Sequence, residues 1–465
     1  MAIPSTTAEA LRPEEAARAT TFGGHPRGLR TLFFTEMWER FSYYGMRALL
    51  VLYLTATIAQ GGVGFSIEKA TSIYGWYTMG VYLAALPGGW IADRFLGQRR
   101  SVLVGGVIIA LGHFSLAVPR IAFLYLGLVL VVIGVGFLKP NISTMVGGLY
   151  RENDPRRDAG FSIFYMGINI GAMIAPLVCG FLAQSSTFRG LLERNGIDPR
   201  LGWHFGFAMA GFGMVFGLVQ FVLGQRQFGA SADGPRERPA AQQAKEHASL
   251  TREDWMRMAA IFVLFVFSCI FWSSFEQAGS SLNLFADRLT ENHIFSHTFP
   301  SSWYQSVNSI FIITLAPVFA WLWVRLRDRE PSSPAKFAWG LFWVGAGFLV
   351  VAAAAAVAQR TGQRVSPWWL VGVYLCHTLG ELCLSPVGLS TVTKLAPVRF
   401  ASLMMGVWFT SLAVGNRIGG WVAGHFDPNG SLPALFLKVA AVAIGSALIL
   451  ALLTRPIKKL MAGVH

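Results

Sequence analysis

Four charged residues stand within one apolar segment near the N-terminus. The stretch EMWERFSYYGMRALL, from Glu36 to Leu50, places Glu36, Glu39, Arg40 and Arg47 among residues typical of a membrane interior. A charged side chain is costly inside a bilayer, and it is usually paired or turned toward a water-filled cavity. Intramembrane charge is functional by default, so a polar path is favoured over a cluster that merely locks helices together.

These charges share one face of a predicted helix. At about 100° per residue, six polar side chains of the stretch fall within an arc of about 140°. They are Glu36, Glu39, Arg40, Tyr43, Tyr44 and Arg47. The remainder of the helix is apolar and can meet lipid or neighbouring helices. The first such segment is therefore predicted to line a polar path.

The elements that must hold these residues are membrane-spanning helices. The chain has 465 residues, of which 54% are hydrophobic and 13% are charged, whereas soluble chains carry about twice that charged fraction. Apolar runs of about twenty residues, the length needed to cross a bilayer, recur along it. They predict twelve spans, at 30–58, 72–93, 101–118, 121–148, 159–184, 203–224, 255–283, 301–324, 336–358, 367–395, 400–424 and 432–454.

A polar segment divides these spans into two groups of six. Residues 225–254 are rich in Ala, Gly, Pro and charge, and we expect a flexible cytoplasmic linker there. Two six-span halves resemble the layout of the major facilitator fold, so the expected fold class is an all-α membrane protein of that kind. The predicted parts are a tail at 1–29, bundles at 30–224 and 255–455 on either side of the linker, and a tail at 456–465.

A glycine-rich loop motif supports this architecture. The sequence GGWIADRFLGQRR, from Gly88 to Arg100, resembles the loop motif that follows the second span in that superfamily. We expect Gly89 and Gly97 to permit a close helix approach and a turn. Asp93 is expected to pair with the basic residues at the helix ends.

The distribution of basic residues predicts the orientation. The net charge is +14, and most of the 38 lysines and arginines fall on one side of the predicted topology. The positive-inside rule assigns that side to the cytoplasm, so the charge is an orientation signal and not a nucleic-acid surface. The protein is predicted to be a multi-pass protein of the cell membrane, which is the inner membrane if the source is bacterial, with both termini cytoplasmic.

The charges that lie deep within spans are not scattered. The deep acids are Glu36, Glu39, Glu276 and Glu381, out of 24 acidic residues in the chain. Together with Lys139, they fall on spans one, four, seven and ten. In the major facilitator layout these four helices line the central cavity. Arg417 lies nearer the end of span eleven, and its role is open.

Several motifs resemble those of the proton-coupled oligopeptide transporter (POT) family. EMWERFSYYG resembles the E-x-x-E-R motif of its first span, GVGFLKPNIS its fourth-span motif, FSIFYMGINIGAMIAP its fifth-span motif and FWSSFEQ its seventh-span motif. The resemblance covers nearly the whole chain in the same order. Two features differ: the linker is too short and too polar for the extra helices of many bacterial members, and span two lacks the His of some animal members.

A site that accepts many peptides should bind their constant parts. Arg47 and Lys139 are cations suited to a carboxylate, and Glu381 is suited to an ammonium group. Asn169 and Asn308 can donate to and accept from a backbone amide. Aromatic walls are expected from Tyr43, Tyr44, Tyr82, Trp272 and Trp408. The resemblance implies the same roles.

Some of these residues have simpler interpretations. Tyr82, Trp272 and Trp408 can equally be packing or interface residues. Asn169 can be a residue that only bridges helices. These alternatives stay open on sequence alone.

Proton coupling needs a carboxylate that is paired in one conformation and unpaired in another. The candidates are Glu36, Glu39 and Glu276, with Arg40, Arg47 and Lys139 as partners. The resemblance implies that Arg47 pairs with Glu276. No cofactor beyond the coupling proton is expected.

The predicted function is proton-driven symport of di- and tripeptides by alternating access. The sequence contains no phosphate-cradling loop, metalloprotease motif or plausible Ser/His/Asp set, so it does not indicate an enzyme. The partners expected are small peptides, protons and the lipid bilayer, with no nucleic acid, and the protein is expected to be a monomer. The alternatives are the same fold moving another solute, such as nitrate or a drug-like anion, and a peptide receptor without net flux.

Overall fold

Twelve long helices dominate the described part of the chain. The computed structural model describes residues 20–150, 154–228, 250–294, 297–397 and 400–462. Each predicted span corresponds to one long helix. The helices are α2 (Arg27–Thr55), α3 (Ile67–Ile91), α4 (Gln98–Leu116), α5 (Ile121–Gly148), α6 (Arg157–Gln184), α8 (Gly202–Gly224), α10 (Arg252–Phe275), α12 (Gln305–Leu326), α13 (Ser333–Thr361), α14 (Trp368–Leu395), α15 (Ala401–Ala423) and α16 (Leu432–Leu460).

Shorter elements connect the long helices. The short helices are α7 (Ser186–Arg194) and α11 (Ser281–Arg288), and the two-stranded antiparallel pairs are β1 (Thr20–Phe22) with β2 (His25–Pro26) and β3 (His293–Ile294) with β4 (His297–Thr298). Tighter turns are η1 (Ile58–Gln60), η3 (Pro199–Leu201), η4 (Gln225–Gln227), η6 (Glu276–Gly279), η7 (Ser301–Tyr304) and η8 (Arg327–Arg329), and η2 (Ala92–Leu96) is a wider, π-helical turn.

Within the described residues, nine helices are long and apolar enough to cross a membrane on those criteria alone. The other three long helices are α2, α3 and α15, which have 29, 25 and 23 residues. Their length suffices for a span of about 30 Å at about 1.5 Å per residue. Helix α2 is more polar because it contains the charged face described above.

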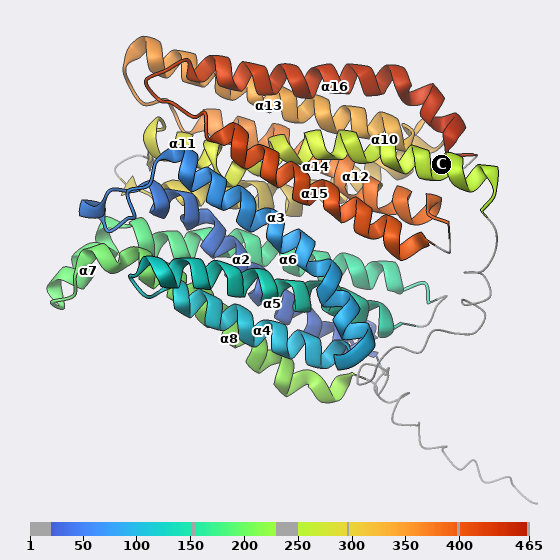
Figure 1. Ribbon diagram of the computed structural model, residues 1–465, viewed down its shortest axis with the longest axis horizontal. Helices are drawn as coiled ribbons and strands as arrows, with labels where there is room; N and C mark the ends of the chain where they lie inside the picture. The colour runs from blue at the N-terminus through green and yellow to red at the C-terminus, as the bar shows by residue number, and fades with distance from the viewer. Residues whose placement is uncertain (1–19, 151–153, 229–249, 295–296, 398–399, 463–465) are drawn as a thin grey trace, which may run out of the picture.

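The long helices form two layers. Figure 1 shows α2, α3, α4, α5, α6 and α8 in one layer and α10, α12, α13, α14, α15 and α16 in the other, with their axes roughly aligned. We call these layers the N-half and the C-half. The end at which α8 ends and α10 begins is the linker end, and the opposite end, where α7 and α11 lie, is the distal end.

Each half is packed mainly within itself. In the N-half α2 packs against α6 and α8, and α5 packs against α3 and α4. In the C-half α13 packs against α14 and α16, and α10 packs against α15. The halves meet where α3 contacts α15 and where α6 contacts α12.

The contact between α3 and α15 depends on two glycines. A Cβ atom on Gly420 would lie 2.8 Å from the Cα of Gly75 and 2.7 Å from the carbonyl oxygen of Thr71. Neither distance is compatible with a side chain, so glycine lets the two backbones touch. This crossing joins the N-half to the C-half toward the distal end.

Two helix boundaries differ from the expected ones. The sequence predicts the seventh span as one run at 255–283, but α10 ends at Phe275 and the chain passes through η6 before α11 begins. The last helix continues to Leu460, beyond the predicted end at 454, because Arg455, Lys458 and Lys459 extend its final turns. Positively charged residues at a helix C-terminus are favourable.

Part of the predicted organisation falls outside the described residues. The residues outside the described part include 1–19 of the predicted tail and 229–249, the centre of the predicted linker. On either side of the centre, η4 and α10 lie at the linker end.

The glycine-rich loop motif makes a turn at Gly97, whose φ is +74° and therefore favours glycine. The close approach expected at Gly89 is instead made by Gly88. A Cβ on Gly88 would lie 2.1 Å from the carbonyl oxygen of Gly136 on α5, whereas one on Gly89 would make ordinary contact with Pro140. The two residues differ because neighbouring positions point to different sides of a helix.

A small cluster ties the start of α2 to the loop after α5. The OH of Tyr150 lies 2.9 Å from Nδ1 of His25. Arg156 donates to the carbonyl oxygen of Gly24 at 2.9 Å and to Asp154 at 2.8 Å. These hydrogen bonds from Arg156 lower the pKa of Asp154 to about 2. The cluster fixes the linker end of α2, the helix that carries the charged face.

Candidate functional site

Glu36, Glu39 and Arg40 of α2 form one buried cluster. Arg40 donates to both carboxylate oxygens of Glu39, with Nη2 at 2.7 Å from Oε1. Its Nε also lies 3.3 Å from Oε1 of Glu36. All three residues are buried, with at most 4% of their surface exposed. One arginine therefore faces two carboxylates, so the cluster has one acidic group in excess of its cation.

Arg47 of α2 makes an ion pair with the other half. Nη2 of Arg47 lies 2.5 Å from Oε2 of Glu276 on η6, and Nε of Arg47 donates to the OH of Tyr74 on α3 at 2.7 Å. Both members of the ion pair are 5% exposed. Breaking a buried pair by removing one partner is costly. The contact therefore holds the two halves together at this point.

The break between α10 and α11 places Glu276 for this pair. A Cβ on Gly279 would lie 2.1 Å from the OH of Tyr74 and 3.1 Å from Nε of Arg47. Only a residue without a side chain lets the backbone of η6 pass so close to these groups.

Further contacts join the halves at the distal end. The Nδ2 of Asn283 donates to the carbonyl oxygen of Ala48 at 2.8 Å. Trp303, Ser306 and Ser302 make similar bonds to α6: Trp303 Nε1 to Leu177 O at 3.0 Å, Ser306 Oγ to Met173 O at 2.7 Å, and the backbone N of Ser302 to Gln184 Oε1 at 3.2 Å. These contacts close the distal end around the Arg47–Glu276 pair.

Lys139 on α5 faces the aromatic ring of Tyr82 on α3. Its Nζ lies 4.5 Å from the ring centroid, which is a cation–π distance. Lys139 interacts electrostatically with the carboxylates of Glu39 and Glu36, yet it makes no ion pair with any residue in the described ranges. A cation held by an aromatic face stays available to an incoming anion.

Glu381 on α14 forms the acidic part of the C-half. The Nδ2 of Asn308 on α12 donates to Oε2 of Glu381 at 3.1 Å and to Oγ1 of Thr378 at 3.0 Å. Glu381 also interacts electrostatically with Arg47 and with Tyr44 of the N-half. Glu381, the predicted partner of a substrate ammonium group, therefore interacts across the two halves with Arg47, one of the two cations predicted to bind the substrate carboxylate.

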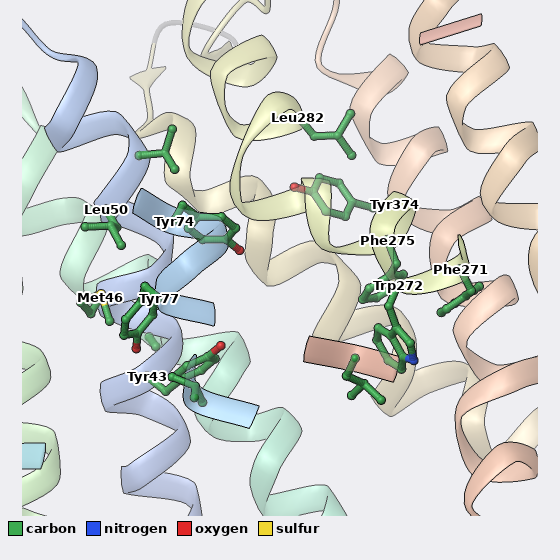
Figure 2. Packing of buried hydrophobic residues seen from close by; sticks show 14 of the residues in the cluster. Tyr43, Met46, Leu50, Tyr74, Tyr77, Phe271, Trp272, Phe275, Leu282 and Tyr374 are labelled. Carbon is green, nitrogen blue, oxygen red and sulfur yellow. The ribbon is translucent and has the colours of Figure 1, made fainter. Parts of the chain in front are cut away.

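Aromatic side chains gather around these charges. Figure 2 shows Tyr43 and Tyr77 on helices of the N-half, and Trp272 and Tyr374 on helices of the C-half. Tyr43 stacks on Tyr77 with centroids 6.5 Å apart and contacts Tyr44 edge-on at 5.2 Å. Within the described residues, the N–H of Trp272 and the hydroxyl groups of Tyr77 and Tyr374 are buried without a hydrogen-bond partner. Such groups are available to a polar ligand.

Two predicted binding residues take part in packing. The Nδ2 of Asn169 donates to the carbonyl oxygen of Tyr165, one turn earlier on the same helix, at 3.1 Å. The ring of Trp408 packs against Phe337, with centroids 5.8 Å apart, and close to Gly388. These contacts favour the packing interpretation for Trp408, and its role in binding stays a prediction, as does that of Asn169.

Sequence reasoning missed Tyr74 and Tyr77. They lie three positions apart on α3, so both face the charged side of α2. Tyr74 is the hydrogen-bond partner of Arg47, and Tyr77 stacks on Tyr43. The spacing of the two tyrosines in the run SIYGWYT is a usable signal, but an aromatic pair at helical spacing is as often simple packing.

Comparison with known proteins places the chain among transporters. The profile of the POT family matches residues 99–246 and 240–432. The chain is 39% identical to "Peptide transporter YePEPT" of Yersinia enterocolitica, covering 95% of this chain and 96% of the relative. It is 34% identical to the "Di-/tripeptide transporter" of Lactococcus lactis subsp. cremoris, covering 96% and 98% of the two chains.

A solved structure agrees in fold. A variant of the peptide transporter POT in complex with alafosfalin is 37% identical, covers 98% of this chain and 100% of its own, and superposes with a TM-score of 0.86. The predicted all-α, two-half membrane fold is confirmed by this match. The chain is a multi-pass membrane transporter that belongs to the POT family, the family whose span motifs its sequence resembles.

Proposed function

We propose that this protein moves di- and tripeptides across the cell membrane together with protons, by alternating access. The observation that carries the proposal is the arrangement of charge across the two halves. Glu381 in the C-half interacts electrostatically with Arg47 in the N-half, and Lys139, against the ring of Tyr82, provides a second cation of the N-half. Every unmodified peptide has an ammonium group and a carboxylate, so this arrangement recognises its constant ends.

The names of two relatives support the substrate class. The Yersinia relative is named a peptide transporter and the Lactococcus relative a di-/tripeptide transporter, and both match along almost the whole chain. Asn308 donates to Glu381, and the N–H of Trp272 is buried without a hydrogen-bond partner among the described residues. These neutral polar groups suit the backbone amides of a short peptide.

Proton coupling rests on carboxylates that change partners. With the distal end closed, Glu276 is paired with Arg47. We infer that protonation of Glu276 removes this attraction and lets the distal end open, and that reclosure releases the proton toward the linker end. The cluster of Glu36, Glu39 and Arg40 is the second candidate, because its two carboxylates share one arginine.

The same proposal includes an orientation and an assembly state. The linker end is assigned to the cytoplasm, since most basic residues are predicted there and both termini belong to it. One chain provides both the acidic and the cationic sides of the site, so a monomer in the lipid bilayer is sufficient. The tails at 1–29 and 456–465, the bundles at 30–224 and 255–455, and the linker at 225–254 remain the proposed parts.

The decisive test uses purified protein in proteoliposomes supplied with labelled dialanine outside. We expect uptake against a concentration gradient when an inward proton gradient is imposed, and loss of that accumulation when an ionophore removes the gradient. Free amino acids and tetrapeptides should compete poorly with the labelled dipeptide, while tripeptides should compete well.

Two other results would select the alternatives. Saturable dialanine binding with no flux in either condition would identify a peptide receptor. Proton-driven uptake of nitrate or of a drug-like anion, without competition from dipeptides, would identify the same fold with another solute.

A further inference from the structure

A second cavity lies between α3 and α15, separate from the site above. Its volume is about 540 Å³, and its lining residues belong to the distal parts of these helices. Its walls come from both halves of the protein. The lining residues that matter here are Glu68, Lys69 and Trp76 of α3, Arg417 and Trp421 of α15, and His425 after α15.

The glycine crossing closes one side of this cavity. The backbones of α3 and α15 touch at Gly75 and Gly420, and both Gly420 and its neighbour Trp421 line the cavity. The cavity therefore lies beside the point where the backbones of α3 and α15 are in contact with no side chain between them. The cavity is a consequence of helix geometry and not of a loop.

Arg417 is one of two cations that line this cavity. Its Cζ lies 4.7 Å from the ring centroid of Trp76, a cation–π distance. No carboxylate in the described ranges lies within ion-pair distance of it. The GNRIGG segment that contains it has no role in the charge pairs of the transport site. Arginine is suited to phosphate because its planar fork can donate two hydrogen bonds to one oxyanion.

The surroundings of Arg417 are electropositive and amphipathic. Lys69 and Arg417 contribute two cations against the single carboxylate of Glu68. Trp76 and Trp421 are 58% and 59% exposed. Tryptophans on the outer faces of spanning helices are typical of the zone where lipid headgroups lie. A ligand here would meet cations on one side and apolar rings on the other.

We propose that this cavity is a binding site for a phosphate anion, supplied either by an anionic phospholipid or by soluble phosphate. Arg417 binds the phosphate oxygens, Lys69 adds charge at the mouth, and Trp421 and Trp76 contact the apolar part of a lipid. Because the walls come from both halves, an occupant favours the conformation in which α3 and α15 stay together. Glu68 opposes binding through its charge.

Three substitutions in the full-length protein test whether each charge favours or opposes binding of the anion. Arg417→Gln should weaken binding about tenfold, since it removes a charge-assisted hydrogen bond. Lys69→Gln, on the exposed mouth, should weaken it less, and Glu68→Gln should strengthen it. Arg360→Gln is the matched control, because Arg360 is an exposed arginine at the end of α13, outside the cavity.

Two measurements distinguish the sources of phosphate. Native mass spectrometry in detergent with added dioleoylphosphatidylglycerol or dioleoylphosphatidylcholine measures lipid retention. Thermal unfolding with millimolar inorganic phosphate, against sodium chloride of equal ionic strength, measures the soluble anion. Selective retention of phosphatidylglycerol identifies a lipid site, and stabilisation by phosphate alone identifies a soluble one; either result supports the proposal when it follows the charge series.

Equal retention and equal stabilisation for the wild type, Lys69→Gln and Glu68→Gln would overturn the proposal. These two variants alter exposed side chains of the first turn of α3, so they stay informative if Arg417→Gln does not fold. Arg417→Lys should bind better than Arg417→Gln but less well than the wild type, because lysine keeps the positive charge and lacks the planar guanidinium group.

Discussion

Nη2 of Arg47 lies 2.5 Å from Oε2 of Glu276, although the two residues are 229 positions apart in the chain. The ion pair joins α2 of the N-half to η6 of the C-half, and it is buried on both sides. A pair in this position is formed only while the distal ends of the halves are together. It is therefore the contact through which a proton can control opening.

The first prediction concerns Glu276→Gln, which imitates the protonated carboxylate permanently. The variant should keep peptide binding and peptide-for-peptide exchange, because neither requires a net proton movement. It should lose accumulation driven by a proton gradient. Both activities can be measured with labelled dialanine in the same proteoliposomes.

Glu291→Gln is a suitable control for this variant, since Glu291 is an acid of the C-half near the distal end whose side chain is 45% exposed. It should leave both activities unchanged. If Glu276→Gln still concentrates peptide under an imposed proton gradient, coupling belongs instead to Glu36 or Glu39.

The second prediction concerns the ammonium partner of the substrate. Glu381→Gln should weaken binding of free dipeptides about 10- to 100-fold, since a hydrogen bond to a charged group contributes about 1.5–3 kcal/mol. N-acetylated dipeptides, which lack the ammonium group, should lose much less. Competition against a labelled dipeptide measures both, and an equal loss for the two ligands would remove Glu381 from this role.

The third prediction concerns Lys139, whose Nζ lies against the ring of Tyr82. Lys139→Ala should abolish proton-driven uptake, because it removes a cation that interacts with Glu36 and Glu39 and that we assign to the peptide carboxylate. Lys139→Arg should retain part of the activity. Near-normal concentrative uptake by Lys139→Ala would contradict the assignment.

The fourth prediction concerns the tyrosine that accepts a hydrogen bond from Arg47. Tyr74→Phe should destabilise the closed distal end by about 1.5–3 kcal/mol, the usual contribution of a hydrogen bond to a charged group. Distances between spin labels on α7 and on the β3–β4 segment, measured by electron paramagnetic resonance, should shift toward a more open population. Tyr53→Phe, a packing tyrosine of the same half, should not cause this shift.

The fifth prediction concerns the close approach of η6 to α3. Gly279→Ala places a methyl group 2.1 Å from the OH of Tyr74, and overpacking of this kind costs about 1–3 kcal/mol. The closed distal end should be disfavoured and concentrative uptake should fall. Gly445→Ala is the control, because a Cβ there meets nothing within 4 Å, and equal uptake by the two variants would refute the steric argument.

The sequence is sufficient to predict the helices and the charged face of α2. Apolar length predicts a span because every backbone polar group must be satisfied within the membrane. The polar arc of α2 follows from helical periodicity alone. For these reasons the grouping of Glu36, Glu39 and Arg40 into one cluster follows from their spacing along a single helix.

Contacts between distant elements cannot be predicted in the same way. The break at η6 depends on the approach of Gly279 to Tyr74, and no local pattern reports it. Trp408 is expected from the sequence to line the site, but its ring packs against Phe337 of its own half. A helical period fixes which residues share a face, while the partner of that face depends on how the halves dock.

The backbone crossing of Gly75 and Gly420 affects how the two halves can move relative to each other. Elsewhere a change in the angle between two helices requires interlocked side chains to change rotamers, which resists motion because packed interiors are dense. At Gly75 and Gly420 the two backbones meet without interlocked side chains. The point where α3 meets α15 can therefore act as a pivot, about which the N-half and the C-half tilt without unlocking their own interiors.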